Sequence, residues 1–232
     1  MNALLLKQTT PMVQGFSLFS DLSPADCATV ISAAREKSFA RKQTIFAEGD
    51  PVEQVIMLLC GCVKVSQIGL SGNEVILRLN GAGEIVGAFR MCAHCNHCST
   101  ATAVQSSVAL VWDSVEFERL LGRFPALRRN TVFLLEERLR EMEQRFREVS
   151  TEKVHSRLSG ELLRLCKRLS RDGDGLMEIT LSRAELAQLT GTTLFTVSRL
   201  LCQWQSLGIV KIRREAVLVR DFAALTQLSE SE

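Results

Sequence analysis

An apolar stripe on an otherwise charged segment constrains this fold more than any other feature of the sequence. After Pro125, apolar residues recur with spacings of three and four, and the residues between them are mostly Glu and Arg. So narrow a stripe on so polar a helix is typical of a two-stranded coiled coil, because the remaining surface is too polar to be widely buried. The stripe consists of Val132, Leu135, Leu139, Met142, Phe146 and Val149. We predict a long helix that pairs two copies of the chain, although the stripe could instead pack against the chain's own N-terminal part.

The residues before this helix follow the pattern of short strands separated by turns. An apolar run from Val55 to Cys60 ends at Gly61, and Ser71-Gly72-Asn73 marks a turn before the strand pattern resumes at Val75. Residues 103–112 form a further pair of short apolar segments. Many short strands with glycine turns are typical of a barrel or jelly roll, so we predict an α+β chain that begins with such a domain.

Beyond the stripe, a second helix and a hinge are expected. Ser150 and Thr151 interrupt the apolar spacing, and side chains of this type favour helix N-caps. The helix that they would cap buries one face, made of Val154, Leu158, Leu162, Leu165 and Leu169. We therefore place a hinge and a domain boundary at Ser150-Thr151.

Residues 182–206 carry the spacing of a helix-turn-helix. Ser182 and Glu185 match a capping box that opens a short helix, and Gly191 suits the left-handed turn that ends it. Thr193 can cap the next helix, which runs to about Ser206 with Val197, Leu200 and Leu201 inward. Residues 208–220 then predict two short strands around a polar turn, which would form a wing.

Such a motif predicts DNA binding through the N-terminal residues of its second helix. Arg199 suits a bidentate contact with guanine, and the threonines suit phosphates or a thymine methyl group. The charge agrees, since residues 151–220 hold 12 basic and 7 acidic side chains while residues 1–150 hold 16 of each. The candidate DNA-contacting residues are Ser182, Arg183, Thr192, Thr193, Leu194, Phe195, Thr196, Ser198, Arg199, Lys211 and Arg213. Leu194 and Phe195 could instead pack against a neighbouring helix.

Three of the eight cysteines lie within seven residues, in the pattern C-x2-C-x2-C formed by Cys92, Cys95 and Cys98. His94 and His97 lie between them, so one polar loop presents several soft metal ligands. The spacing resembles the first three ligands of a bacterial ferredoxin, which favours an iron–sulfur cluster. A zinc ion, a thiol–disulfide switch without metal, haem bound through a histidine, and a loop without a role remain alternatives. The fourth ligand could come from Cys27, Cys60, Cys62, His94, His97 or a second subunit.

The cysteines outside this loop have simpler interpretations. Cys166 lies on the apolar side of its helix and Cys202 follows two leucines, so both are expected to be small core residues. Cys60 and Cys62 flank a glycine turn, where packing is a simpler role than metal binding.

Several motifs together resemble the CRP/FNR family of bacterial transcription regulators over nearly the whole chain. The matching stretches are Leu18-Phe-Ser-Asp-Leu-Ser, Gly49-Asp50, Gly61-Cys-Val-Lys-Val, Gly83-Glu84-Ile-Val-Gly87 and Gly191-Thr-Thr-Leu-Phe-Thr-Val-Ser-Arg199. The resemblance implies a cupin-like β-roll sensor of the cyclic-nucleotide-binding type in residues 1–125, a dimerisation helix in 126–150 and a winged helix-turn-helix in 151–232. It also implies a homodimer on a palindromic double-stranded operator, acting through RNA polymerase.

Two departures from the family pattern bear on the signal and on the operator. Family members that bind cyclic AMP hold its phosphate with an Arg-Ser pair, whereas no arginine lies between Met91 and Ala109 here. An anionic phosphate without a positive partner would be poorly held, so cyclic AMP is not the expected ligand. Family members often carry a glutamate where Phe195 stands, so their usual half-site is not expected either.

We therefore expect a cytoplasmic homodimeric regulator that senses a redox or gas signal through the cysteine loop. One alternative is a regulator that senses a small ligand or haem in the β-roll and has a structural zinc or thiol loop. A second alternative is a redox or electron-transfer protein, for which the helix-turn-helix and wing would have no use. Neither an enzyme nor a membrane protein is expected, because no catalytic constellation and no apolar run of membrane-spanning length occur in the sequence.

Overall fold

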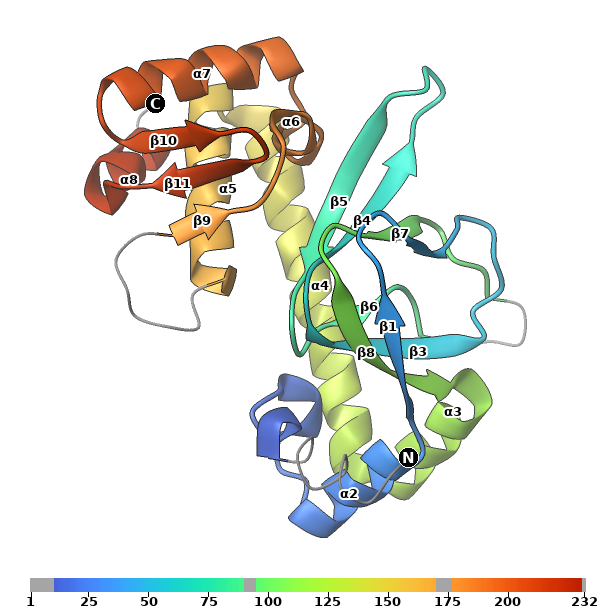
Figure 1. The fold of residues 1–232 in the computed structure, drawn as a ribbon. Helices are drawn as coiled ribbons and strands as arrows, with labels where there is room; N and C mark the ends of the chain where they lie inside the picture. Colours follow the sequence, from blue (N-terminus) through green and yellow to red (C-terminus); the bar gives the residue numbers. More distant parts are fainter. Residues whose placement is uncertain (1–10, 90–94, 170–176, 231–232) are drawn as a thin grey trace. The chain divides into compact units, whose positions relative to one another are not determined.

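The computed structural model describes residues 11–89, 95–169 and 177–230, which fall into two compact units (Figure 1). One unit comprises Met1–Ile68 and Leu77–Arg140, and the other comprises Gly69–Ile76 and Glu141–Glu232. The helices include η1 (Ser17–Phe19), α2 (Pro24–Ser32), α3 (Ser114–Arg123), α4 (Pro125–Thr151), α5 (Val154–Leu169), α6 (Arg183–Thr190), α7 (Leu194–Ser206) and α8 (Phe222–Glu230). The strands that precede α3 in the chain are β1 (Arg35–Phe39), β2 (Thr44–Phe46), β3 (Gln54–Cys60), β4 (Val63–Ile68), β5 (Glu74–Asn80), β6 (Ile85–Val86), β7 (Thr100–Ala103) and β8 (Ser107–Asp113).

These eight strands form two four-stranded antiparallel sheets. Their orders are β1-β8-β3-β6 and β2-β7-β4-β5, so strands that are neighbours in a sheet are often distant in the sequence. This is a domain of the jelly-roll type expected from the strand and turn pattern, the β-roll that the family resemblance implies, and the α+β fold class is confirmed (Figure 1).

Strand β3 has no polar alternation because both of its faces are buried. Val55 and Met57 point into a core shared with the helices, whereas Ile56 and Leu58 point into the core shared with β4, β7 and β8. Successive side chains of a strand point to opposite faces, so a strand covered on both sides becomes a continuous apolar run.

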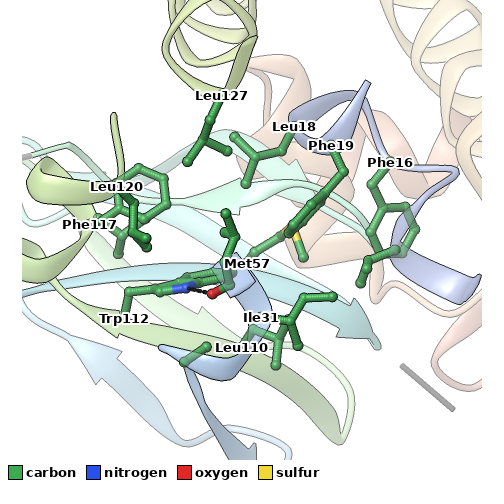
Figure 2. Packing of buried hydrophobic residues seen from close by; sticks show 14 of the residues in the cluster. Phe16, Leu18, Phe19, Ile31, Met57, Leu110, Trp112, Phe117, Leu120 and Leu127 are labelled. Carbon is green, nitrogen blue, oxygen red and sulfur yellow. Dashed lines mark hydrogen bonds between the residues drawn. The ribbon is translucent and has the colours of Figure 1, made fainter. Parts of the chain in front are cut away.

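The core beneath the helices is organised around Trp112 (Figure 2). Its indole N–H donates to the carbonyl of Val30 at 2.8 Å, and its ring meets Phe117 edge-on with centroids 5.5 Å apart. Trp112 thereby joins α2, β8 and α3, and Leu127 at the start of α4 completes the same cluster. The first turns of α4 are in this way fixed to the β-roll.

Ser150 and Thr151, where a helix cap was expected, lie within α4. Helix α4 continues through both residues to Thr151, and their hydroxyls donate to the carbonyls of Phe146 and Arg147, each at 2.8 Å. Both side chains therefore bond back onto their own helix instead of capping α5, so the capping prediction is wrong. The break falls at Glu152-Lys153, between α4 and α5.

The C-terminal unit holds α5 to α8 and a three-stranded sheet of order β10-β11-β9, made of β9 (Met177–Ile179), β10 (Val210–Arg213) and β11 (Ala216–Val219). Strands β10 and β11 are the predicted wing hairpin, whereas β9 was not foreseen because three residues are too few to show an alternating pattern. Leu158, Leu162 and Leu165 of α5 are buried as expected. No helix in the described part of the chain combines the length and the apolar character that crossing a bilayer requires.

Candidate functional site

The turn between α6 and α7 has the predicted local geometry. Ser182 accepts from the backbone N–H of Glu185 at 3.2 Å, and the Glu185 carboxylate accepts from the backbone N–H of Ser182 at 2.8 Å, which completes the capping box. Gly191 has φ 62°, in the left-handed region where a side chain would be strained. Thr193 caps α7 by accepting from the N–H of Thr196 at 3.2 Å. These local contacts orient α7 relative to α6.

Helix α7 buries one face and leaves the opposite face open. Val197, Leu201 and Trp204 lie in the core of the unit. Residues spaced by four, three and four on the other side are all exposed, and we call them the reading stripe: Phe195, Arg199, Cys202 and Ser206. With no described contact to cover it, this stripe is available to a groove in a partner.

Three residues of α7 for which burial was considered or predicted are exposed in the structure. Leu194 is 52% exposed and Phe195 is 76% exposed, so neither side chain is buried. Cys202 is exposed although a core position was predicted, because the helical phase set by Val197 and Leu201 turns position 202 outward. By contrast Cys166 is buried as predicted, and burial raises its pKa to about 11.

Some of the remaining candidate DNA-contacting side chains already make hydrogen bonds within the chain. The hydroxyl of Ser182 is engaged with the Glu185 carboxylate at 2.7 Å, and the hydroxyls of Thr193 and Thr196 are 2.9 Å apart. On the wing, Arg213 donates to both carboxylate oxygens of Glu178 at 3.0 and 3.1 Å. The other candidates are exposed or half-buried: Arg183, Thr192, Ser198 and Lys211.

Arg157 of α5 ties the end of α4 to the turn that precedes α7. Its guanidinium donates to the carbonyl of Glu152 at 2.7 Å and to the carbonyls of Thr190 and Gly191 at 3.2 and 3.5 Å. The sequence analysis missed this residue, because an arginine on an amphipathic helix carries no signal of which carbonyls it will meet. One side chain therefore links the residue that follows α4 to the turn of the helix-turn-helix.

An ion-pair network, also missed, joins the last turns of α4 to α5. Arg164 donates to both oxygens of Glu148 at 2.7 and 2.9 Å and, through Nε, to Glu161 at 2.8 Å, while Arg145 pairs with Glu161 at 2.9 Å. Both carboxylates are buried. Burial alone would raise the pKa of Glu148, but the hydrogen bonds and charge of Arg164, aided by Gln144 and Arg145, lower it. The buried carboxylates of the network therefore stay ionised because arginines pair with them where water is excluded.

The predicted dimer stripe on α4 is largely open in the single chain. Its exposed members are Val132, Leu139, Met142, Phe146 and Val149. Leu135 is the exception, since it is half-buried against the core beneath the helices. Five large apolar side chains on one helix expose more apolar surface than scattered single residues normally do, which marks an interaction surface.

Part of the cysteine loop lies in the described residues. Residues 95–98 run antiparallel to residues 49–52. The backbone N–H of Val52 donates to the carbonyl of Cys95 at 2.9 Å. The N–H of Gly49 donates to the carbonyl of His97, and the N–H of His97 donates to the carbonyl of Asp50, each at 2.8 Å. Cys95 is half-buried and Cys98 is exposed, whereas Cys92 and His94 lie outside the described residues. The backbone of the loop is therefore anchored to the β-roll at its C-terminal half.

His97 is used in packing. Its ring stacks on Phe46 with centroids 3.6 Å apart and an interplanar angle of 10°, and a side chain at Gly87 would collide with Phe46 and crowd His97. Burial lowers the pKa of His97, an effect that the nearby Asp50 carboxylate partly opposes. The imidazole is therefore neutral at pH 7, the form that can bind a metal.

The described residues do not assemble a closed metal site. No group of three or more His, Cys, Asp or Glu side chains within them is arranged to hold an ion. Among the possible fourth ligands, Cys27 and Cys62 are buried, and Cys60 is exposed at the end of β3. Burial, with the adjacent Asp26 charge, raises the pKa of the Cys27 thiol, which disfavours its thiolate.

The β-roll has an arginine close to β6, although the sequence predicted no positive partner for the phosphate of a cyclic nucleotide. Arg138 of α4 donates to the carbonyl of Gly87 at 2.9 Å and to that of Ile85, and its guanidinium lies 5.7 Å from the centre of the Phe89 ring. This cation near β6 is committed to backbone carbonyls. Residues 95–109 contribute no arginine or lysine of their own.

Two family models match the chain. One, described as a cyclic nucleotide-binding domain, matches residues 36–124, and the other, described as a Crp-like helix-turn-helix domain, matches residues 156–228. Together they cover the β-roll with α3 and the whole helix-turn-helix with its wing.

Curated proteins and solved structures agree with these models. The chain is 29% identical to the cyclic AMP receptor protein of Thermus thermophilus, over 94% of this chain and 98% of that protein. It is 26% identical to the fumarate and nitrate reduction regulatory protein of Escherichia coli, over 84% of this chain and 78% of that protein. The structure of FixK2 from Bradyrhizobium japonicum superposes with a TM-score of 0.76 at 23% identity, over 86% of this chain and 98% of that one, which is a likeness of fold.

Proposed function

The chain belongs to the CRP/FNR family of DNA-binding transcription regulators, and on that premise we propose that two copies pair through α4 and bind a palindromic operator in response to a signal at the β-roll. The observation that carries this proposal is the reading stripe of α7, which leaves Phe195 and Arg199 exposed on a helix whose opposite face is packed into its unit. RNA polymerase is the proposed further partner.

The stripe supports sequence reading in the major groove. The N-terminal residues of a recognition helix contact base edges, and Arg199 lies on the second turn of α7 with its guanidinium exposed. Arginine recognises guanine by two parallel hydrogen bonds to O6 and N7. The half-buried Thr192 and the exposed Lys211 flank this helix and suit phosphate contacts.

Arg199→Ala tests the DNA-binding function directly. Each subunit would lose a bidentate contact worth about 1–3 kcal/mol, so we expect sequence-specific affinity to fall while binding to random DNA is retained. The measurement is a fluorescence anisotropy titration of both proteins against an operator obtained by selection from random DNA. Arg220→Ala, which removes an exposed arginine after β11 and outside the stripe, is the control. Equal discrimination by wild type and Arg199→Ala would refute this reading of α7.

For the signal, we propose a redox or gas input through Cys92, Cys95 and Cys98. The names of the relatives differ on this point, since one refers to cyclic AMP and the other to fumarate and nitrate reduction. The absence of arginine between Met91 and Ala109 argues against a cyclic nucleotide phosphate, and the soft thiolate and imidazole donors favour an iron–sulfur cluster, with zinc as the alternative. The described residues do not complete a ligand set for such a group.

Anaerobic purification followed by a visible spectrum and metal analysis tests this part of the proposal. We expect a brown protein with iron and sulfide that air bleaches, and we expect Cys95→Ser to abolish the colour. Cys166→Ser is the matched control, because that buried thiol on α5 is far along the chain from the loop. A colourless protein with zinc or without metal would assign the loop a structural or thiol role and leave a small ligand or haem as the signal.

A further inference from the structure

The first turn of α7 displays an apolar surface where a DNA-reading helix ordinarily displays polar groups. Phe195 and Leu194 are 76% and 52% exposed, and this turn contains no acidic residue. The polar groups beside them are already engaged, since Thr193 caps the helix and its hydroxyl lies 2.9 Å from that of Thr196. What this turn offers to a base edge is therefore a phenyl ring.

An exposed phenyl ring at this position is unfavourable in the free protein. Leaving a phenylalanine in water forgoes about 1.5–3 kcal/mol of burial free energy. The same helix buries Val197, Leu201 and Trp204 on its opposite face, whereas Phe195 is the more exposed of its two exposed large apolar residues. Phe195 thus lies on the open side of the helix, on the reading stripe and one turn before Arg199.

The major groove offers one apolar group that such a ring can meet. Among the four bases only thymine presents a methyl group there, and contact between phenylalanine and that methyl is an established pairing. Cytosine and adenine present an amino group instead, whose hydrogen bond to water would be lost against a phenyl ring without replacement. A helix with Phe195 at this place therefore favours thymine and penalises cytosine.

We propose that Phe195 is a specificity-determining residue that reads the 5-methyl group of a thymine in each half-site. Residues four apart on a helix are separated by about 6 Å along its axis, and base pairs by roughly 3.4 Å. The thymine therefore lies within about two base pairs of the guanine that Arg199 contacts. This inference rests on the proposed DNA-binding function and adds the base that is read.

The test uses the full-length protein, purified anaerobically and in air, to select its operator from random duplex DNA. Each thymine of the selected site is then replaced singly by deoxyuridine, which removes only the methyl group. Burying one methyl group is worth about fourfold in affinity, so we expect one thymine per half-site at which the replacement weakens binding about fourfold. Phe195→Ala should abolish that difference.

Two further variants make the result specific. Leu207→Ala removes another exposed apolar side chain at the far end of α7 and should leave the deoxyuridine profile unchanged. Phe195→Glu supplies an acceptor for the cytosine amino group and should shift the preferred base at that position from thymine to cytosine. Both substitutions are at exposed sites, so the fold is expected to tolerate them.

The outcomes separate this inference from the function on which it rests. A selected operator with no deoxyuridine effect, or an effect that survives in Phe195→Ala, overturns the role of Phe195 and leaves DNA binding intact. Failure to select any sequence under either condition overturns the proposed function and this inference together.

Discussion

Phe146→Glu is expected to dissociate the dimer and with it to abolish tight operator binding. Phe146 is 77% exposed in the single chain and lies within the apolar stripe of α4, so pairing through this stripe would bury it. A carboxylate at this place would face its symmetry mate in a desolvated seam, where two like charges cannot be paired. Without the link between two half-sites, operator affinity should fall by about 10²–10⁴-fold.

Sedimentation equilibrium and anisotropy titration on the same samples measure the two effects. Val115→Glu is the control, because it introduces the same charge at an exposed apolar position on α3, away from the stripe. We expect it to leave both the mass and the operator affinity unchanged. A Phe146→Glu protein that stays dimeric would mean that α4 does not form the interface.

Arg164→Leu is expected to have the largest effect on stability. The substitution keeps much of the side-chain volume but leaves Glu148 without its cation and Glu161 with Arg145 alone. Both carboxylates are buried, and removing one partner of a buried ion pair costs about 3–5 kcal/mol in the free energy of unfolding. Chemical denaturation at pH 7 gives the difference between variant and wild type.

The pH dependence distinguishes lost charge pairing from lost packing. In the wild type the pKa of Glu148 is below its ordinary value of 4.5, so its stabilising contribution is present above that value and is lost as the pH falls through the lower, folded-state pKa. Without Arg164, only Gln144 and Arg145 oppose the effect of burial, so the pKa of Glu148 is expected to rise and protonation of Glu148 to stabilise the variant. The destabilisation should therefore shrink as the pH is lowered from 7 towards 5.

Arg140→Leu is the matched control for this prediction. Arg140 pairs with Glu136 one turn away, but the two side chains are 66% and 54% exposed. Exposed pairs of this kind are worth less than about 1 kcal/mol, so the control should be nearly as stable as the wild type at every pH. A destabilisation of Arg164→Leu that stays constant between pH 7 and 5 would assign its effect to packing.

The cap, the turn and the recognition helix could be predicted from the sequence because each depends on neighbours within one or two turns. The Ser182–Glu185 box and Gly191 are local, and the helical phase of Val197 and Leu201 follows from spacing alone. The same local logic failed at Ser150-Thr151, where a hydroxyl has two local options. It can cap the next helix or bond back to its own, and the continuation of α4 decided between them.

By itself, then, the sequence determined a strand-rich domain, a long helix with an apolar stripe and a helix-turn-helix with a wing, because periodicity and caps are properties of adjacent residues. Only the tertiary structure decided that Leu194 and Phe195 stay exposed, that Arg157 reaches the Gly191 turn and that Arg164 meets Glu148. The pairs Arg157–Gly191 and Arg164–Glu148 lie 34 and 16 residues apart in the chain, and side chains so far apart meet only once the core has set the geometry of the helices.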